Sequence, residues 1–165
     1  MMLNKKNLIY FFSIFLVILI GTIITVKKIS PLSYFWWGKV NVENNTAAHG
    51  QDVVAYFLGK SLKGNNKFSV TYDDILYLFS TAENANKFSL SPNKFVPQFG
   101  GYCAFATSKG FTADVSINAW TVVENKLYFF ADTDMQKEWL NGIAHGSLKL
   151  SHVNWNKVQL PDGTE

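Results

Sequence analysis

The stretch 67-KFSVTYDDILYLFSTAENANKFSLSP-92 contains the clearest pattern in the chain, an alternation of apolar and polar residues that changes to a helical spacing. The alternation runs on both sides of the Asp-Asp pair at 73–74, which predicts a β-hairpin that turns at this pair. Ser80 and Glu83 then have the spacing of a helix capping box. Pro92 predicts the end of that helix. The stretch therefore predicts a hairpin followed by a helix.

The same arrangement recurs further along the chain. The stretch 119-AWTVVENKLYFF-130 predicts a second hairpin with its turn at 124–125. Asp132 or Thr133 is placed to cap a following helix, which Gly142 ends. Aromatic residues make up 16% of the chain, and their spacing is typical of core positions. We expect an α+β fold: two β-hairpin-plus-helix units around one aromatic-rich core.

An uncharged apolar segment precedes these units. Residues 8–26 carry no charged side chain and would form a helix about 28 Å long, close to the thickness of a bilayer core. The segment lacks the small-residue cleavage site of a secretory signal, which predicts an uncleaved transmembrane helix. Lys5 and Lys6 precede it, and a short lysine-bearing N-terminus usually stays in the cytoplasm. The expected location of the following domain is the extracytoplasmic, periplasmic side.

These patterns divide the chain into four parts. A transmembrane anchor is expected at 1–28 and a juxtamembrane linker at 29–46. One globular domain is expected at 47–160, followed by a polar tail at 161–165.

The composition narrows the range of functions. The net charge is +3, and lysines beside the apolar segment supply much of the positive charge, so no basic surface for nucleic acid is expected. The single cysteine, Cys103, excludes an internal disulfide. A lone exposed thiol is a liability in an oxidising compartment, so this cysteine is expected to be buried, bound to metal, or functional.

Four motifs in order resemble the YHS-domain proteins, specifically a single-domain branch with a Gly-Gly-Tyr-Cys-Ala motif. They are HGQDVVAYF at 49–57, YLFSTAENANKF at 77–88, SPNKFVPQFGGYCAFATSKG at 91–110, and AWTVVENKLYFF at 119–130. The resemblance covers nearly all of the soluble part of the chain. It implies a small binding domain that is related to the TRASH domains of heavy-metal transport.

The thiolate ligands of those relatives are absent here. The corresponding positions are Ala55, Ser80 and Asn84, so the resemblance does not carry over that metal site. Cys103 and His49 remain as candidate ligands for a copper-class or zinc-class ion. Two protein ligands make a weak site, which Asp52, Asp114, a tyrosine or a second chain would have to complete.

Two interpretations of Cys103 stay open. In the first it is a small buried residue, Gly100 and Gly101 allow close backbone approach, and Tyr102 belongs to the core. In the second the glycines open a short helix at 102–108. A thiol in its first turn would have a lowered pKa and act as a metal ligand or a nucleophile.

The leading hypothesis is a membrane-anchored small domain that binds copper or zinc through Cys103, with His49 as the helper. Its expected partner is a metal transporter or another membrane protein. The alternative is a non-catalytic anchored interaction module with a structural, buried Cys103. A thiol-dependent redox or hydrolytic enzyme comes third, so an enzymatic function is less favoured than a binding function.

Overall fold

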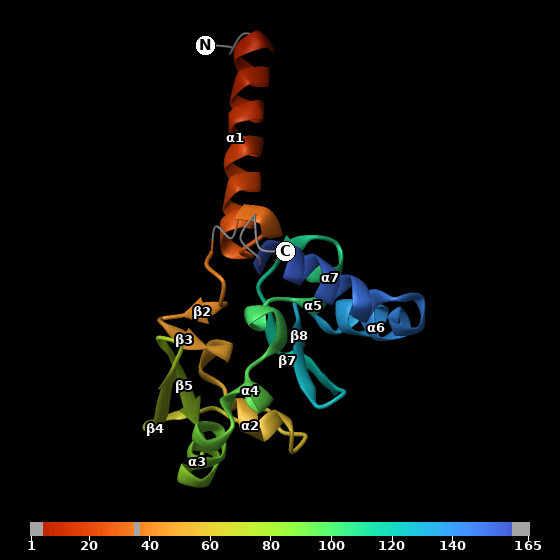
Figure 1. Ribbon diagram of the computed structural model, residues 1–165. Helices are drawn as coiled ribbons and strands as arrows, with labels where there is room; N and C mark the ends of the chain where they lie inside the picture. The colour runs from red at the N-terminus through yellow and green to blue at the C-terminus, as the bar shows by residue number, and fades with distance from the viewer. Residues whose placement is uncertain (1–4, 35–36, 160–165) are drawn as a thin grey trace.

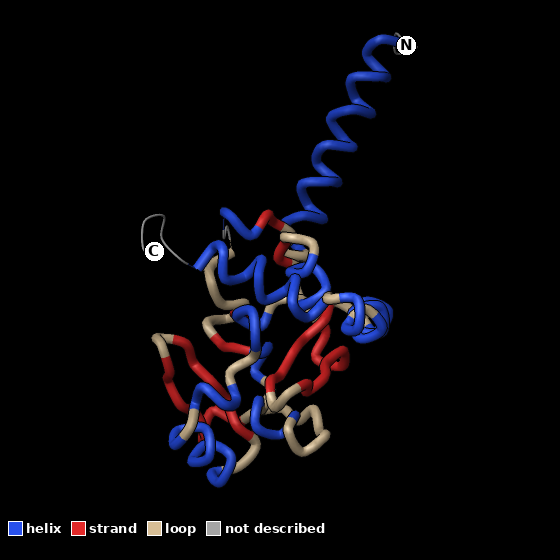
Figure 2. The backbone as a smooth tube through the Cα atoms, turned by 45° about the vertical axis from the view of Figure 1, so that its right-hand side comes forward, coloured by secondary structure: helices blue, strands red, loops and turns tan. Residues whose placement is uncertain are grey.

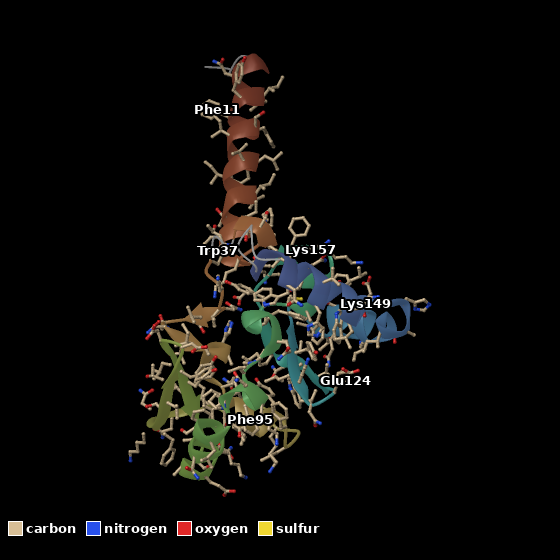
Figure 3. All side chains as sticks on the ribbon, viewed as in Figure 1. Phe11, Trp37, Phe95, Glu124, Lys149 and Lys157 are labelled. Atoms are coloured by element: carbon tan, nitrogen blue, oxygen red, sulfur yellow. The ribbon has the colours of Figure 1, made fainter. Side chains whose placement is uncertain are left out.

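The structure is a computed structural model that describes residues 5–34 and 37–159; the tail expected at 161–165 lies outside this part. Helix α1 (Lys5–Val26) stands away from the domain (Figure 1). Its segment Asn7–Val26 has a mean hydropathy of 2.6, and none of it is buried. The side chains of α1 project outward, as Phe11 does (Figure 3). One N-terminal helix is therefore long and apolar enough to cross a membrane.

The segment that follows α1 is hydrogen-bonded into the domain. Strand β1 (Ser30–Pro31) pairs antiparallel with β6 (Phe111–Thr112). Strand β2 (Val42–Glu43) pairs antiparallel with β3 (Thr46–Ala47). Residues 29–46, expected as a linker, thus include strands β1 and β2 and the first residue of β3.

The first hairpin-plus-helix unit forms where the sequence predicts it. Strands β4 (Asn65–Tyr72) and β5 (Ile75–Phe79) pair antiparallel. Both turn residues, Asp73 and Asp74, have positive φ, which is typical of the tight turns that match the twist of a hairpin. Helix α3 (Ala82–Leu90) follows. Strand β3 adds to this hairpin in parallel with β5, which gives the strand order β2-β3-β5-β4.

The predicted cap of α3 is wrong by one residue. Thr81 is the N-cap, and its side chain accepts a hydrogen bond from the Asn84 amide at 3.1 Å. The Ser80 hydroxyl donates instead to Asp52, at 2.6 Å. A distant carboxylate therefore takes the group that the local pattern assigns to the cap. Helix α3 ends before Pro92, as expected, and the short α4 (Pro92–Phe95) begins there.

The second unit also confirms its prediction. Strands β7 (Ser116–Val123) and β8 (Lys126–Phe130) form a hairpin that Figure 2 shows apart from the first one. Asp132 caps α6 (Thr133–Asn141) by accepting from the Met135 amide at 2.7 Å. Helix α7 (Ser147–Gln159) then packs on α5 (Ala104–Ser108). The short α2 (Val53–Tyr56) lies between the hairpins (Figure 1).

The core consists of two clusters rather than one. Strand β8 is buried on both faces, and successive side chains of a strand point in opposite directions. Leu127 and Phe129 accordingly join a cluster with the first hairpin and α3. Tyr128 and Phe130 join a second cluster with α5 and α6. The expectation of an aromatic-rich core is met, with β8 as its dividing wall.

Candidate functional site

Cys103 lies at the start of α5 and is fully buried, at 0% exposure. Its backbone N–H donates to the Ala113 carbonyl at 3.1 Å. The side chain belongs to the second core cluster, whose aromatic members are Phe99, Tyr128, Phe130 and Trp139. The structure therefore places the only thiol in the packed interior.

Burial raises the pKa of the Cys103 thiol above its usual value, although the backbone N–H groups of Ala106, Ala131 and Phe105 act in the opposite direction. The interpretation with a lowered pKa in a helical first turn is therefore not supported. Helix α5 has only five residues, so the field at its start is weak compared with the desolvation of a thiolate. The thiol stays protonated at neutral pH, in which form it is a poor nucleophile and a poor metal ligand.

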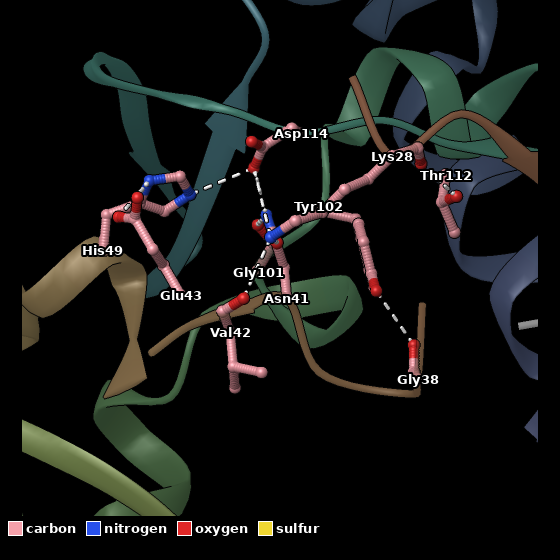
Figure 4. Close-up of polar contacts among 10 residues, drawn as sticks. All are labelled: Lys28, Gly38, Asn41, Val42, Glu43, His49, Gly101, Tyr102, Thr112 and Asp114. Carbon is pink, nitrogen blue, oxygen red and sulfur yellow. Dashed lines mark hydrogen bonds and ion pairs between the residues drawn. The ribbon is translucent and has the colours of Figure 1, made fainter. Parts of the chain in front are cut away.

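His49 lies in a 3₁₀ turn, Ala48–Gly50, and its two ring nitrogens face two carboxylates (Figure 4). Nε2 is 3.0 Å from an Asp114 oxygen, and Nδ1 is 3.3 Å from a Glu43 oxygen. No contact joins His49 to Cys103. Among residues 5–34 and 37–159, no group of three or more His, Cys, Asp or Glu side chains is arranged to hold a metal ion. Asp52 and Asp114 were the carboxylates expected to complete a metal site with His49. His49 contacts Asp114 but not Asp52.

Asp114 is the centre of a polar cluster between the domain and the segment after α1 (Figure 4). It accepts from Asn41 Nδ2 at 2.9 Å, and Lys28 Nζ lies 3.9 Å away. Lys28 also donates to Asn41 Oδ1 at 2.6 Å. Burial alone would raise the pKa of Asp114, but the hydrogen bonds from His49 and Asn41 outweigh it and hold this pKa well below its usual range. The carboxylate is therefore ionised and fixed in place.

The Gly-Gly-Tyr motif fastens the same segment to the domain. The Asn41 N–H donates to the Gly100 carbonyl at 2.8 Å, and Asn41 Nδ2 donates to the Gly101 carbonyl at 3.4 Å. The Tyr102 hydroxyl donates to the Gly38 carbonyl at 2.9 Å (Figure 4). A Cβ on Gly100 would overlap the Lys39 carbonyl oxygen. We call this contact between residues 100–102 and residues 38–41 the junction.

Asp52 is a buried residue that sequence reasoning named only as a spare ligand. Its Oδ1 accepts from the Val54 and Ala55 amides at 2.9 and 3.1 Å. Its Oδ2 accepts from the Ser80 amide and hydroxyl and from Asn84 Nδ2, at 2.9, 2.6 and 2.7 Å. Ala55, Ser80 and Asn84 therefore all donate hydrogen bonds to one carboxylate. An Asp directly before the apolar run of α2 is a helix-cap signal that could have indicated its role.

A cavity of about 170 Å³ lies beside the junction, between β5, α4 and the Gly-Gly turn. Its walls are mostly apolar, with a few polar groups. They comprise Val40, Ala47, Ala48, Tyr72, Asp73, Ile75, Tyr77, Asn93, Val96, Pro97, Gly100 and Gly101. Gly100 and Gly101 of the motif thus line this cavity, whereas Cys103 does not.

No protein-family model, no curated protein and no solved structure matches the chain. The similarity to YHS-domain proteins therefore rests on the four sequence motifs.

Proposed function

We propose that this protein is a single-pass membrane protein whose YHS-type domain is a non-catalytic binding module. The observation that carries this proposal is the position of Cys103. Its thiol is sealed among aromatic rings and has a raised pKa, which favours a structural role over a ligand or nucleophile. The motif around it holds the membrane-proximal segment to the domain, so its residues also have a structural task.

The proposed anchor is α1, which has the length and hydropathy of a membrane span and buries nothing against the domain. Within residues 5–34, no flexible linker separates α1 from the domain. The Asp114 N–H donates to the Lys27 carbonyl at 2.7 Å, directly after α1. The Leu32 N–H donates to the Gly110 carbonyl at 3.0 Å. The short lysine-bearing N-terminus favours placing the domain on the extracytoplasmic side.

Metal binding through Cys103 and His49 receives no support from the site geometry. The two side chains lie in different surroundings, and each His49 nitrogen already faces a carboxylate. A thiol-dependent enzyme would need a base beside the sulfur, and no histidine contacts Cys103 among the described residues. The interaction module is therefore preferred over both.

Metal loading of the full chain tests this choice. The purified protein and the variant Cys103→Ala are each exposed to zinc or copper(I), desalted, and analysed for bound metal. We expect equal metal contents in the two proteins, because the sulfur is sealed. Stoichiometric metal in the wild type that is lost in Cys103→Ala, with unchanged circular dichroism, would revive the metal-binding hypothesis.

The anchor has its own test in cell membranes. An uncleaved span predicts that the protein keeps its full mass of 18.6 kDa and stays in the membrane pellet after an alkaline carbonate wash. A shorter, washable product would mean that α1 acts as a signal sequence.

A further inference from the structure

The hydroxyl of Tyr77 is a buried polar group that lacks a protein partner. Tyr77 is 5% exposed, and its ring packs on Phe88 with centroids 4.7 Å apart. Within the described ranges, no residue hydrogen-bonds its hydroxyl, whereas buried polar groups are nearly always paired. Trp37 Nε1 is the one sealed and unpaired side-chain polar atom there, so the Tyr77 oxygen is not sealed. Tyr77 is also one of the residues that line the cavity beside the junction.

One carboxylate, that of the exposed Asp73, borders the cavity near Tyr77. Asp73 lines it, and burial together with the nearby Asp73 and Tyr72 raises the pKa of Tyr77 to about 12. The Tyr72 hydroxyl donates to Asn93 Oδ1 at 2.8 Å, so its own proton is already used. The described lining residues include no lysine, arginine or histidine. The cavity thus offers a carboxylate and oxygen acceptors with no basic side chain to neutralise them.

The other walls are apolar and limit the size of an occupant. Val40, Ala47, Ile75, Val96 and Pro97 line them. A volume of about 170 Å³ is close to that of a cavity that holds one benzene ring, which corresponds to an occupant of about six non-hydrogen atoms. An occupant that suits this cavity is short, apolar at one end and positively charged at the other.

We propose that this cavity binds a small organic cation, with its charged nitrogen between the Asp73 carboxylate and the Tyr77 hydroxyl. Its apolar end would lie against Val96 and Pro97. This inference rests on the proposed function, since it names the ligand class of the binding module. It also gives the Gly-Gly turn a second task, because Gly100 and Gly101 form part of the cavity wall without side chains that would fill it.

Binding of two matched probes tests the proposal. The full chain is placed in lipid nanodiscs and titrated with n-butylammonium and with n-butanol, which have equal numbers of non-hydrogen atoms and differ in charge. The amide signals of Gly100 and Gly101 are followed by NMR. We expect the cation to bind at least about tenfold more tightly than the alcohol, the size of effect that one charge-assisted hydrogen bond supplies.

The two residues of the β4–β5 turn provide a matched pair of variants. Asp73 lines the cavity and Asp74 does not, and both are exposed with positive φ, a conformation that Asn tolerates. Asp73→Asn is expected to abolish the preference for the cation, while Asp74→Asn keeps it. Tyr77→Phe, which keeps the ring, is expected to weaken the cation by about three- to tenfold.

Equal binding of the two probes, binding of neither, or an unchanged preference in Asp73→Asn would overturn the proposal. Circular dichroism of each variant shows whether a loss of binding results from a loss of folding. If Asp73→Asn does not fold, the weaker binding of the cation expected for Tyr77→Phe tests the proposal instead. If the cavity does not bind the cation, the wild type and Cys103→Ala should still have equal metal contents. If the proposed function is wrong, the wild type should bind metal that Cys103→Ala does not bind, whatever the cavity binds.

Discussion

Gly100 sits where the chain segment after α1 passes closest to the domain. Its φ is +59°, and the Lys39 carbonyl occupies the space that a Cβ would need. Only glycine meets both conditions, since other residues pay for a left-handed backbone and here would also clash. The motif glycine is therefore explained by packing of the junction.

We predict that Gly100→Ala lowers the free energy of unfolding by about 3 kcal/mol, from backbone strain of about 1 kcal/mol plus displacement of the junction. Gly110→Ala is the control, because Gly110 also has a positive φ, +87°, but no atom within 4 Å of a Cβ. That variant is expected to lose only about 1 kcal/mol. Chemical denaturation measures both; equal losses would mean that the junction tolerates a side chain.

Asp114 makes stability depend on pH in a defined direction. Its native pKa lies below the ordinary value near 4, so the ionised form stabilises the fold. That contribution is complete above the ordinary pKa and is lost as the pH falls through it toward the native pKa. The Lys28 ammonium group and the His49 ring face the carboxylate, and Glu43 faces the other side of His49.

Denaturation of wild type and Asp114→Asn between pH 7 and pH 3 tests this expectation. The wild type should be more stable by about 2 kcal/mol at neutral pH, a typical value for hydrogen bonds to a charged group. The difference should shrink below about pH 4. A difference that stays constant over this range would show that ionisation of Asp114 does not matter.

For single residues, the sequence shows which side chains could bind a metal, but it does not show which side chains surround them in the fold. Cys103 and His49 can both bind soft metals, but a sequence does not show whether two side chains lie close together. His49 meets Asp114 because β6 and the loop after it pack against the segment after α1. That contact depends on long-range pairing, which has no local signal.

Among the elements, Asp52 ties α2 to the start of α3. Its carboxylate accepts five hydrogen bonds from two chain segments and is 0% exposed. We predict that Asp52→Asn costs about 3 kcal/mol, because the new amide group points an N–H at donors and leaves Ser80 or Asn84 unpaired. Asp132→Asn, at an exposed helix cap, should change stability by less than about 0.5 kcal/mol, since Asn caps equally well. Thermal unfolding compares the two, and similar midpoints would contradict this role of Asp52.

The elements that the sequence predicts are those with a local signal. Both hairpins alternate with a period of two and turn at pairs that accept positive φ, so their strands and turns are where we expect them. Strands β1, β2, β3 and β6 have two residues each, too few for any periodic pattern. They are strands because distant segments pair with them, so residues 29–46 resemble a linker in sequence and form part of the sheets in the structure.

At the scale of the whole molecule, the folded domain begins earlier in the chain than residue 47, because the segment after α1 packs into it. Ser30, Leu32 and Asn41 are each at most 3% exposed, although all precede residue 47, where the domain was expected to begin. The domain therefore extends back to the end of α1. The junction and the polar cluster around Asp114 together hold this first part in place.

We predict that a fragment of residues 27–165 is more stable than a fragment of residues 47–165 by about 3 kcal/mol or more, the sum expected for one buried leucine and a few hydrogen bonds. Thermal unfolding of the two soluble fragments measures the difference. Identical midpoints would mean that residues 27–46 add nothing to the fold, as in a linker.

If the Gly-Gly-Tyr-Cys motif has a structural role, its glycines and tyrosine hold the segment after α1 and its thiol faces the interior. Alkylation of Cys103 in the full chain, in lipid nanodiscs and under native conditions, tests this most directly. We predict no modification by N-ethylmaleimide until guanidinium is added, and then complete modification of the one thiol. Rapid modification of the native protein, with its circular dichroism unchanged, would place the sulfur at a surface and contradict the account.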